Sequence, residues 1–433
     1  MGSFEISLIG FGAMLLLMAL GVPISFAMLI VGSLGISSIV GVKAALGMLG
    51  QLPVSITMNY ELSVVPMFVL MGTFVNRANL SRDLYDAAHA FLGHRRGGLA
   101  MATVVACGGF AAVCGSSLAT AATMAKVAMP SMRRYGFSDT LAVGSIAAGG
   151  TLGILIPPSV ILVIYGIMTG TDIGKLFLGG ILPGLLTIGL YMLTIAITTT
   201  INPTSGPRTE RIGFAERFRR LKRVTAMVFL FLFIIGGIYL GIFTPTEAGG
   251  AGAFGALIFS LWRRALTFSV FMECLLETAR MTTMLFIVLV GAIIFSNFVN
   301  LAGLPEALSK LITSQGVGPM GVIFNMMMVY LLLGCFLDSL AMILLTVPIF
   351  FPIVSGLGLN PIWFGIVVVM ISELALITPP VGMNLFVIKS TVDGVTLPTI
   401  YRGIIPFAIA DVVRITTVIL FPGIPLLLPR LAG

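Results

Sequence analysis

The chain has 433 residues, of which 58% are hydrophobic and only 9% are charged, and its mean hydropathy is +1.12. Soluble domains carry about 25% charged residues, so this composition excludes a large soluble core and predicts an all-α polytopic membrane protein. The net charge of +8 does not indicate nucleic-acid binding, because the basic residues lie in a few short loops between apolar runs, where they set membrane topology.

The cysteines argue against a metal site or a disulfide framework, and the N-terminal segment argues against a removed signal peptide. The four cysteines, Cys107, Cys114, Cys274 and Cys335, lack the spacing of metal ligands or of a disulfide framework, and we interpret them as free thiols. The N-terminus has no basic segment and no small-residue cleavage site before the next apolar run, so a removed signal peptide is not expected.

The two halves of the chain predict the same succession of segments. The first half predicts helices over 4–20 and 23–41, an amphipathic stretch to residue 60, a helix over 63–75, an apolar block over 97–132, a broken segment over 138–169 and a span over 175–199. The second half predicts helices over 224–242 and 245–262, an amphipathic stretch to residue 280, a helix over 281–299, a block over 318–355, a broken segment over 361–390 and a span over 402–421.

Two proline pairs, Pro157-Pro158 and Pro379-Pro380, interrupt apolar runs and lie 222 residues apart. Proline removes an N–H donor and clashes with the preceding turn, so a helix must break at each pair. Other proline and glycine positions match at the same offset, which indicates an internal repeat. Broken backbone at membrane depth persists only where protein, water or a ligand satisfies it, so we expect both breaks to be functional.

The block over 97–132 is too long for one membrane crossing and too short for two, since one crossing needs about 20 residues. Arg95-Arg96 precede it and Arg133-Arg134 follow it, and basic loops stay on the cytoplasmic side. We therefore predict a re-entrant hairpin with its tip at Cys114–Ser117. The block over 318–355 is its counterpart, with its tip at Phe336–Ser339.

Topology follows from the basic loop over 208–223, which holds seven Lys and Arg residues and is predicted to be cytoplasmic. Counting crossings from this loop places the N-terminus outside, the first hairpin's mouth inside and the second hairpin's mouth outside. The halves are therefore predicted to be inverted-topology repeats. Many secondary transporters have this arrangement, with their site at the membrane midplane between discontinuous elements.

Asp338 is the most informative single residue, because a carboxylate at bilayer depth is costly and faces a cavity or a partner. Asp338 and Ser339 at the hairpin tip, with Thr378, Pro379 and Gly382 in the facing break, would supply carboxylate, hydroxyl and carbonyl oxygens. These ligands suit a hard cation, and Na⁺ is the monovalent one available. The competing interpretation is a helix N-cap, and Asp338 can serve as both.

Ser116 and Ser117 hold the equivalent place in the first half, facing Gly153, Ile156 and Pro157. No carboxylate lies in this tip, so a bound Na⁺ would depend on carbonyl and hydroxyl oxygens. Capping of the following helix remains the alternative.

The substrate is predicted to lie between the two breaks. Helix N-termini at Ser159 and Gly382 would point positive dipole ends inward, which favours an anion. No Lys or Arg lies at the predicted midplane, so backbone, hydroxyl and amide groups would hold the anion. The predicted substrate contacts are Pro158, Ser159, Pro380 and Asn384.

Three other polar features have structural interpretations. Thr244–Glu247 has the pattern of a capping box with proline at the first helical position. Asp411 and Arg414, three residues apart, can pair on one helix. Glu373 is either a protonated or cavity-facing carboxylate or a polar group packed between helices, and both possibilities stay open.

Three segments, GILIPPS (Gly153–Ser159), TPTEAG (Thr244–Gly249) and ITPPVG (Ile377–Gly382), resemble the large membrane subunit of tripartite ATP-independent periplasmic (TRAP) transporters. The resemblance covers nearly the whole chain and implies a multi-pass protein of the bacterial inner membrane with an elevator mechanism and Na⁺ coupling. It implies Na⁺ positions at the two hairpin tips with their facing breaks, and no other cofactor is expected.

The resemblance also implies partners. A periplasmic substrate-binding protein would deliver an organic acid, and a small four-helix membrane subunit would be present, expected here as a separate chain. We expect scaffold helices with their arms over 1–62 and 224–280, transport elements over 63–200 and 281–433, and a basic cytoplasmic linker over 201–223.

The predicted function is Na⁺-coupled uptake of a small carboxylate, such as a C4-dicarboxylate or sialic acid. The alternative is a stand-alone anion/cation symporter that needs no binding protein. A channel would need a filter or a gated pore, and an enzyme would need a cluster of ligands or a nucleophile with its base. The sequence offers neither pattern, so we predict no enzymatic activity.

The predicted topology can be tested with a single cysteine in place of Arg133. We expect Arg133→Cys to react with a membrane-impermeant thiol reagent from the cytoplasmic side only, because the first hairpin should open there. Labelling only from the periplasmic side would contradict the hairpin assignment.

Overall fold

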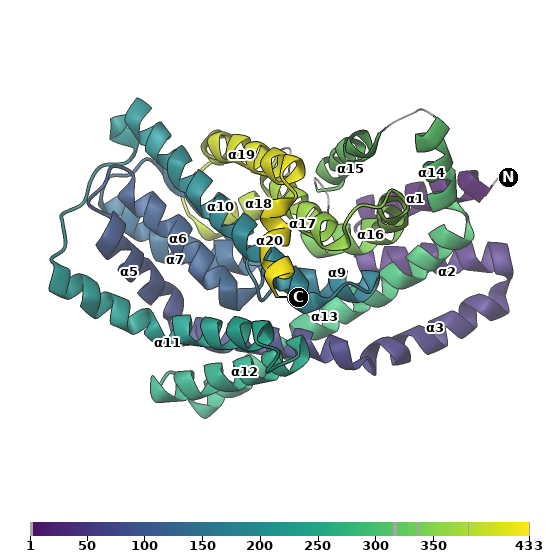
Figure 1. The fold of residues 1–433 in the computed structure, drawn as a ribbon, viewed down its shortest axis with the longest axis horizontal. Coiled ribbons are helices and arrows are strands. Elements are labelled where there is room, and N and C mark those ends of the chain that lie inside the picture. The colour runs from purple at the N-terminus through teal and green to yellow at the C-terminus, as the bar shows by residue number, and fades with distance from the viewer. Residues whose placement is uncertain (1–2, 315–317, 335–336, 380, 433) are drawn as a thin grey trace.

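The computed structural model describes residues 3–314, 318–334, 337–379 and 381–432, and within these ranges the chain is helical, without a β-strand (Figure 1). The predicted all-α class is confirmed. The first-half helices are α1 (Ser3–Ala19), α2 (Ile24–Val40), α3 (Val42–Thr57), η1 (Tyr60–Ser63), α4 (Val64–Arg77), α5 (Leu80–Leu92), α6 (Gly98–Cys114), α7 (Ser117–Arg134), α8 (Asp139–Thr151), η2 (Leu152–Ile154), α9 (Val160–Thr169) and α10 (Ile173–Ile201).

The second half follows a short 3₁₀ turn, η3 (Pro203–Ser205). Its helices are α11 (Phe214–Tyr239), α12 (Pro245–Trp262), α13 (Phe268–Leu301), α14 (Leu304–Ser314), α15 (Pro319–Leu333), α16 (Ser339–Gly356), α17 (Pro361–Ile377), α18 (Met383–Thr391), α19 (Leu397–Leu420) and α20 (Gly423–Leu431). In Figure 1, α3, α11 and α12 run along one edge of the molecule, and α15 and α19 lie on the opposite side.

Several helices are long enough to span a membrane. In the described part of the chain, α10, α11, α13, α16 and α19 have the length and apolar composition of membrane spans. Helix α3 and the η1–α4 segment pass the same test together, as a pair bent by 57°. The protein is therefore multi-spanning, as its composition predicts.

Both halves contain the predicted interruptions. Helix pairs α6–α7 and α15–α16 meet at the two predicted hairpin tips, and pairs α8–α9 and α17–α18 flank the two proline breaks. The internal repeat itself stays a prediction, and so does the inverted relation of the halves.

Helix α13 differs from expectation. The sequence predicts an amphipathic stretch to residue 280 and a separate helix over 281–299, but one helix of 34 residues covers both. No proline lies in this helix, and its polar residues Glu273 and Glu277 pair with Arg77 at 3.3 and 3.6 Å without interrupting it. The expected domain boundary at residue 281 therefore lies inside a continuous helix. Helices α5, α14 and α20 were also absent from the predicted segments.

Glycines allow two pairs of helices to approach closely. A Cβ atom added to Gly32 of α2 would lie 2.9 Å from the Phe295 Cα of α13. A Cβ atom on Gly144 of α8 would collide with the backbone of Gly403 on α19. Because burying apolar side chains gives little driving force within lipid, close backbone packing of this kind is a main source of helix association.

The contact between α8 and α19 can be tested with Gly144→Ala. Forcing a methyl group into a filled contact costs about 1–3 kcal/mol, so we expect a lower thermal unfolding midpoint of the purified protein. Gly189→Ala on α10 is the control, because a Cβ atom there meets nothing within 4 Å. Equal midpoints for both variants would contradict the packing shown.

Candidate functional site

The first hairpin tip is a short turn between α6 and α7. Gly115 has a φ of +62°, a conformation that favours glycine, and extended Ser116 begins the next helix. The Ser116 hydroxyl accepts the Ala119 N–H at 3.4 Å, and the Thr120 hydroxyl donates to the Ser116 carbonyl at 2.7 Å. The predicted capping role is therefore present at this tip.

The first break lies directly against this tip. A Cβ atom on Gly153 would lie 2.5 Å from the Ser116 carbonyl oxygen and 2.9 Å from the Ser117 nitrogen. Beyond the break, the Ser159 hydroxyl donates to the Ile154 carbonyl at 2.5 Å and accepts the Leu162 N–H at 3.4 Å. The residues predicted to face each other are thus brought together, while Ser159 satisfies backbone groups on both sides of the break.

The second hairpin tip has a carboxylate in the capping position. The Asp338 carboxylate accepts the Ala341 N–H at 2.9 Å at the start of α16. Gly334, at the end of α15, packs against Ala375 of α17. The end of α15, next to the second tip, therefore touches the arm that leads into the second break.

The second break begins at Thr378, which leaves the helical conformation with φ −92° and ψ 131°. Its hydroxyl donates to the Leu374 carbonyl at 2.6 Å. Gly382, with φ +64°, precedes α18. Pro380, one of the predicted substrate contacts, lies outside the described residues.

The two hairpin tips converge on one cavity of about 400 Å³. Ser116 and Ser117 line it from the first tip, and Asp338 and Ser339 line it from the second. Residues from different halves of the sequence therefore share one chamber. Among the described residues that line it, none is Lys or Arg.

The opposite wall of the cavity comes from α4 and α13. It contributes Thr73, Asn76 and Glu277, and the Glu277 carboxylate lies 3.6 Å from Arg77. Sequence reasoning missed these residues. The available signal was the spacing of Glu273 and Glu277, one turn apart in a segment that continues into an apolar helix.

The other predicted site residues do not line this cavity. Those in the described part of the chain are Gly153, Ile156, Pro157, Pro158, Ser159, Thr378, Pro379, Gly382 and Asn384. Asn384 is fully buried, and within the described residues neither of its side-chain amide atoms has a hydrogen-bond partner. The carbonyl of Pro158 approaches Gly115, 3.4 Å from an added Cβ atom.

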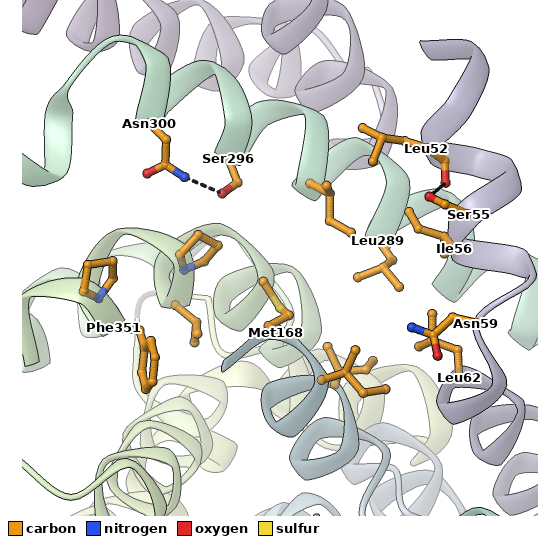
Figure 2. Close-up of a pocket in the computed structure, with 16 residues that line it drawn as sticks. Leu52, Ser55, Ile56, Asn59, Leu62, Met168, Leu289, Ser296, Asn300 and Phe351 are labelled. Carbon is orange, nitrogen blue, oxygen red and sulfur yellow. Dashed lines mark hydrogen bonds between the residues drawn. The ribbon is translucent and has the colours of Figure 1, made fainter. Parts of the chain in front are cut away.

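A second cavity, of about 510 Å³, lies between α3, α9, α13 and α16 (Figure 2). Its polar groups include Asn59, Ser296 and Asn300, and the Asn300 amide donates to the Ser296 hydroxyl at 3.4 Å. Helix α13 lines the first cavity with residues up to Val288 and the second from Leu289 onward. The two cavities therefore succeed each other along this helix.

The structure also tests three predictions about polar side chains outside the two cavities. Thr244 and Glu247 form the predicted capping box, with the Thr244 N–H bonded to Glu247 at 2.8 Å. Asp411 and Arg414 pair at 3.2 Å, as expected. Glu373 lines neither cavity and pairs with Arg414 at 2.7 Å, so it is not cavity-facing but packed between helices, and its protonation stays open.

Comparison with known proteins identifies the family of this chain. Residues 11–424 match the family described as "Tripartite ATP-independent periplasmic transporter, DctM component". The chain is 37% identical to the C4-dicarboxylate TRAP transporter large permease protein DctM of Pseudomonas aeruginosa, over 87% of each chain. It is 34% identical to the sialic acid TRAP transporter large permease protein SiaM of Vibrio cholerae, over 97% of each chain.

The fold also resembles a solved transporter. The crystal structure of the Alcanivorax borkumensis YdaH transporter superposes with a TM-score of 0.60 at 14% identity, covering 88% of this chain and 89% of that one. At this identity the likeness concerns the fold alone. The family match makes the chain a multi-pass inner-membrane permease, not an enzyme, that works with a periplasmic binding protein and partner subunits. The chain belongs to the DctM family, the large permease components of TRAP transporters.

Proposed function

We propose that this permease carries a small carboxylate into the cell in symport with Na⁺, by an elevator movement of its hairpins and broken helices. The observation that carries the proposal is the convergence of both hairpin tips on one cavity. The first tip also lies against its broken segment at Gly153, and the end of α15, next to the second tip, lies against the second broken segment at Ala375.

Na⁺ would bind at the two tips. The first position combines Ser116, Ser117 and the Gly153–Pro157 loop, which supply carbonyl and hydroxyl oxygens. The second combines Asp338 and Ser339 with oxygens from the Thr378–Gly382 loop, and its carboxylate supplies a negative charge. Oxygen ligands of this kind suit hard cations. Capping does not use up the Asp338 carboxylate, since it accepts one N–H and carboxylates have about four acceptor positions.

The anion would occupy the cavity between the tips. The absence of Lys and Arg from its described lining leaves bound Na⁺, hydroxyl groups and helix N-termini as the groups that attract a carboxylate. Simultaneous binding of cation and anion would keep the loaded site close to neutral. This provides a physical reason for coupling, because an unpaired charge is expensive to move through the bilayer.

The elevator would move the tips relative to α4 and α13. The consecutive cavities along α13 support this proposal, because both lie between this helix and elements that carry or adjoin a tip, α9 and α16. Movement along α13 would take the loaded site from one side of the membrane to the other. The stand-alone symporter with no binding protein remains the alternative mechanism.

Two of the similar permeases are named for C4-dicarboxylate and for sialic acid, and both solutes are carboxylates. We therefore propose a small organic acid as the cargo, with a four-helix membrane subunit as the partner. Reconstitution in liposomes tests the proposal. Uptake that needs both Na⁺ and the binding protein supports it, and uptake without the binding protein favours the stand-alone symporter.

Asp338→Asn tests the cation role separately from capping. Asn is as good an N-cap as Asp, but it removes the negative charge, so we expect the Na⁺ concentration for half-maximal transport to rise about tenfold or more, equivalent to about 1.4 kcal/mol. Asp172→Asn is the matched control, because Asp172 caps α10 by accepting the Lys175 N–H at 2.9 Å. Wild-type Na⁺ dependence in Asp338→Asn would argue against the cation site.

Gly153→Ala tests the contact between the first tip and its break. A Cβ atom there collides with the backbone of Ser116 and Ser117, so the tip must move, at a cost of about 1–3 kcal/mol. We expect weaker Na⁺ binding by about fivefold or more, measured by Na⁺ titration of transport. Gly250→Ala, where a Cβ atom meets nothing within 4 Å, should behave as wild type, and unchanged binding in Gly153→Ala would show that the contact is dispensable.

A further inference from the structure

A charge cluster lies outside both cavities, between α10, α17 and α19. Arg414 Nη1 lies 2.7 Å from Glu373 Oε2, and Arg414 Nε lies 3.2 Å from Asp411 Oδ1. All three side chains are fully buried. The cluster connects the arm before the second break to the last long helix of the chain.

The carboxyl groups of Asp411 and Glu373 differ in how many of their oxygens have a partner. Tyr191 donates its hydroxyl to Asp411, with distances of 2.7 and 2.8 Å to the two carboxylate oxygens. Arg414 Nη1 also donates to the Thr187 hydroxyl at 2.8 Å. Within the described residues, Glu373 Oε1 has no hydrogen-bond partner. Both Asp411 oxygens thus lie within reach of the Tyr191 hydroxyl, and Oδ1 also pairs with Arg414, whereas Glu373 has a partner at Oε2 alone.

The net charge of the cluster indicates that one of its carboxyl groups carries a proton. Two carboxyl groups face one guanidinium, which stays protonated in proteins, so full ionisation would leave one net negative charge buried among apolar helices. A buried unpaired charge costs far more than a buried neutral polar group. One proton on a carboxyl group removes this net charge. Glu373 is the better carrier, because a neutral carboxyl group tolerates an unpartnered oxygen at lower cost than an ionised one.

Other ionisable side chains on helices packed against α17 do not supply the missing charge. Asp139 pairs with Arg133 at 3.0 Å, the Lys389 ammonium donates to the Val395 carbonyl at 2.6 Å, and the Tyr165 hydroxyl donates to the Pro361 carbonyl at 2.7 Å. Asp338 at the start of α16 is itself acidic and lines the first cavity. Tyr330 bonds Thr346, and the others lie two or more turns along their helices from the cluster or at the end of α20: Lys175, Tyr401, Arg402 and Arg430.

We propose that Glu373 is a proton-binding site, and that its proton keeps the Glu373–Arg414–Asp411 cluster neutral and α17 docked on α19. Removal of this proton at alkaline pH leaves one net negative charge in the cluster and weakens that docking. Glu373 lies outside both cavities.

Infrared spectroscopy of the purified complex tests the site directly. At neutral pH we expect a deuterium-sensitive carbonyl band of a protonated carboxylic acid, which Glu373→Gln removes. This band should shift when the protein contains isotopically labelled glutamate, and should not shift with labelled aspartate. A shift with aspartate alone, or no such band, would overturn the assignment. The labelling uses the wild-type chain, so the result stands even if the variant folds poorly.

Thermal unfolding provides a second readout. The unfolding midpoint of the wild-type complex should fall as the pH rises through the loss of this proton, and Glu373→Gln should lose most of that fall because glutamine mimics the neutral acid. Asp172→Asn, on the exposed start of α10, should keep the wild-type fall. An identical fall in wild type and Glu373→Gln would overturn the proposal.

Discussion

The membrane imposes one constraint on which the rest of this structure depends: each backbone N–H and carbonyl group in lipid needs a partner inside the protein. The proline pairs end α8–η2 and α17 and free backbone groups within apolar segments. The structure places the first hairpin tip against the first break, where Gly153 meets Ser116, and the end of α15 against the arm before the second break, where Gly334 meets Ala375. Glycine is required at such contacts because any side chain would hold the two backbones apart.

The same constraint governs the charged groups. Asp338 caps α16 and faces the cavity. Glu277 pairs with Arg77 at the opposite wall, and Arg414 lies between two carboxyl groups in the buried cluster. Each charge thus has either a counter-charge or access to a cavity.

Much of the architecture could be read from local patterns. Proline pairs, apolar runs and basic loops are local signals, and they predict the hairpin tips, the breaks and most helices within a few residues. The exceptions have physical reasons. Helix α13 stays continuous because no proline interrupts it, and its charged residues pair with Arg77, a residue almost 200 positions earlier. Helices α5 and α14 are short and amphipathic, so they lack the apolar signal of a membrane span.

The sequence by itself determined the family, the breaks and the oxygen-bearing residues near them, because these depend on residue type and spacing. Only the tertiary structure decided which of them meet. It brought Ser116 and Asp338 to one chamber, kept Thr378 and Asn384 out of its lining, and added Thr73, Asn76 and Glu277 from the opposite wall. It also paired Glu373 with Arg414 across two helices. Contacts between distant segments depend on how helices pack, and no local pattern encodes that packing.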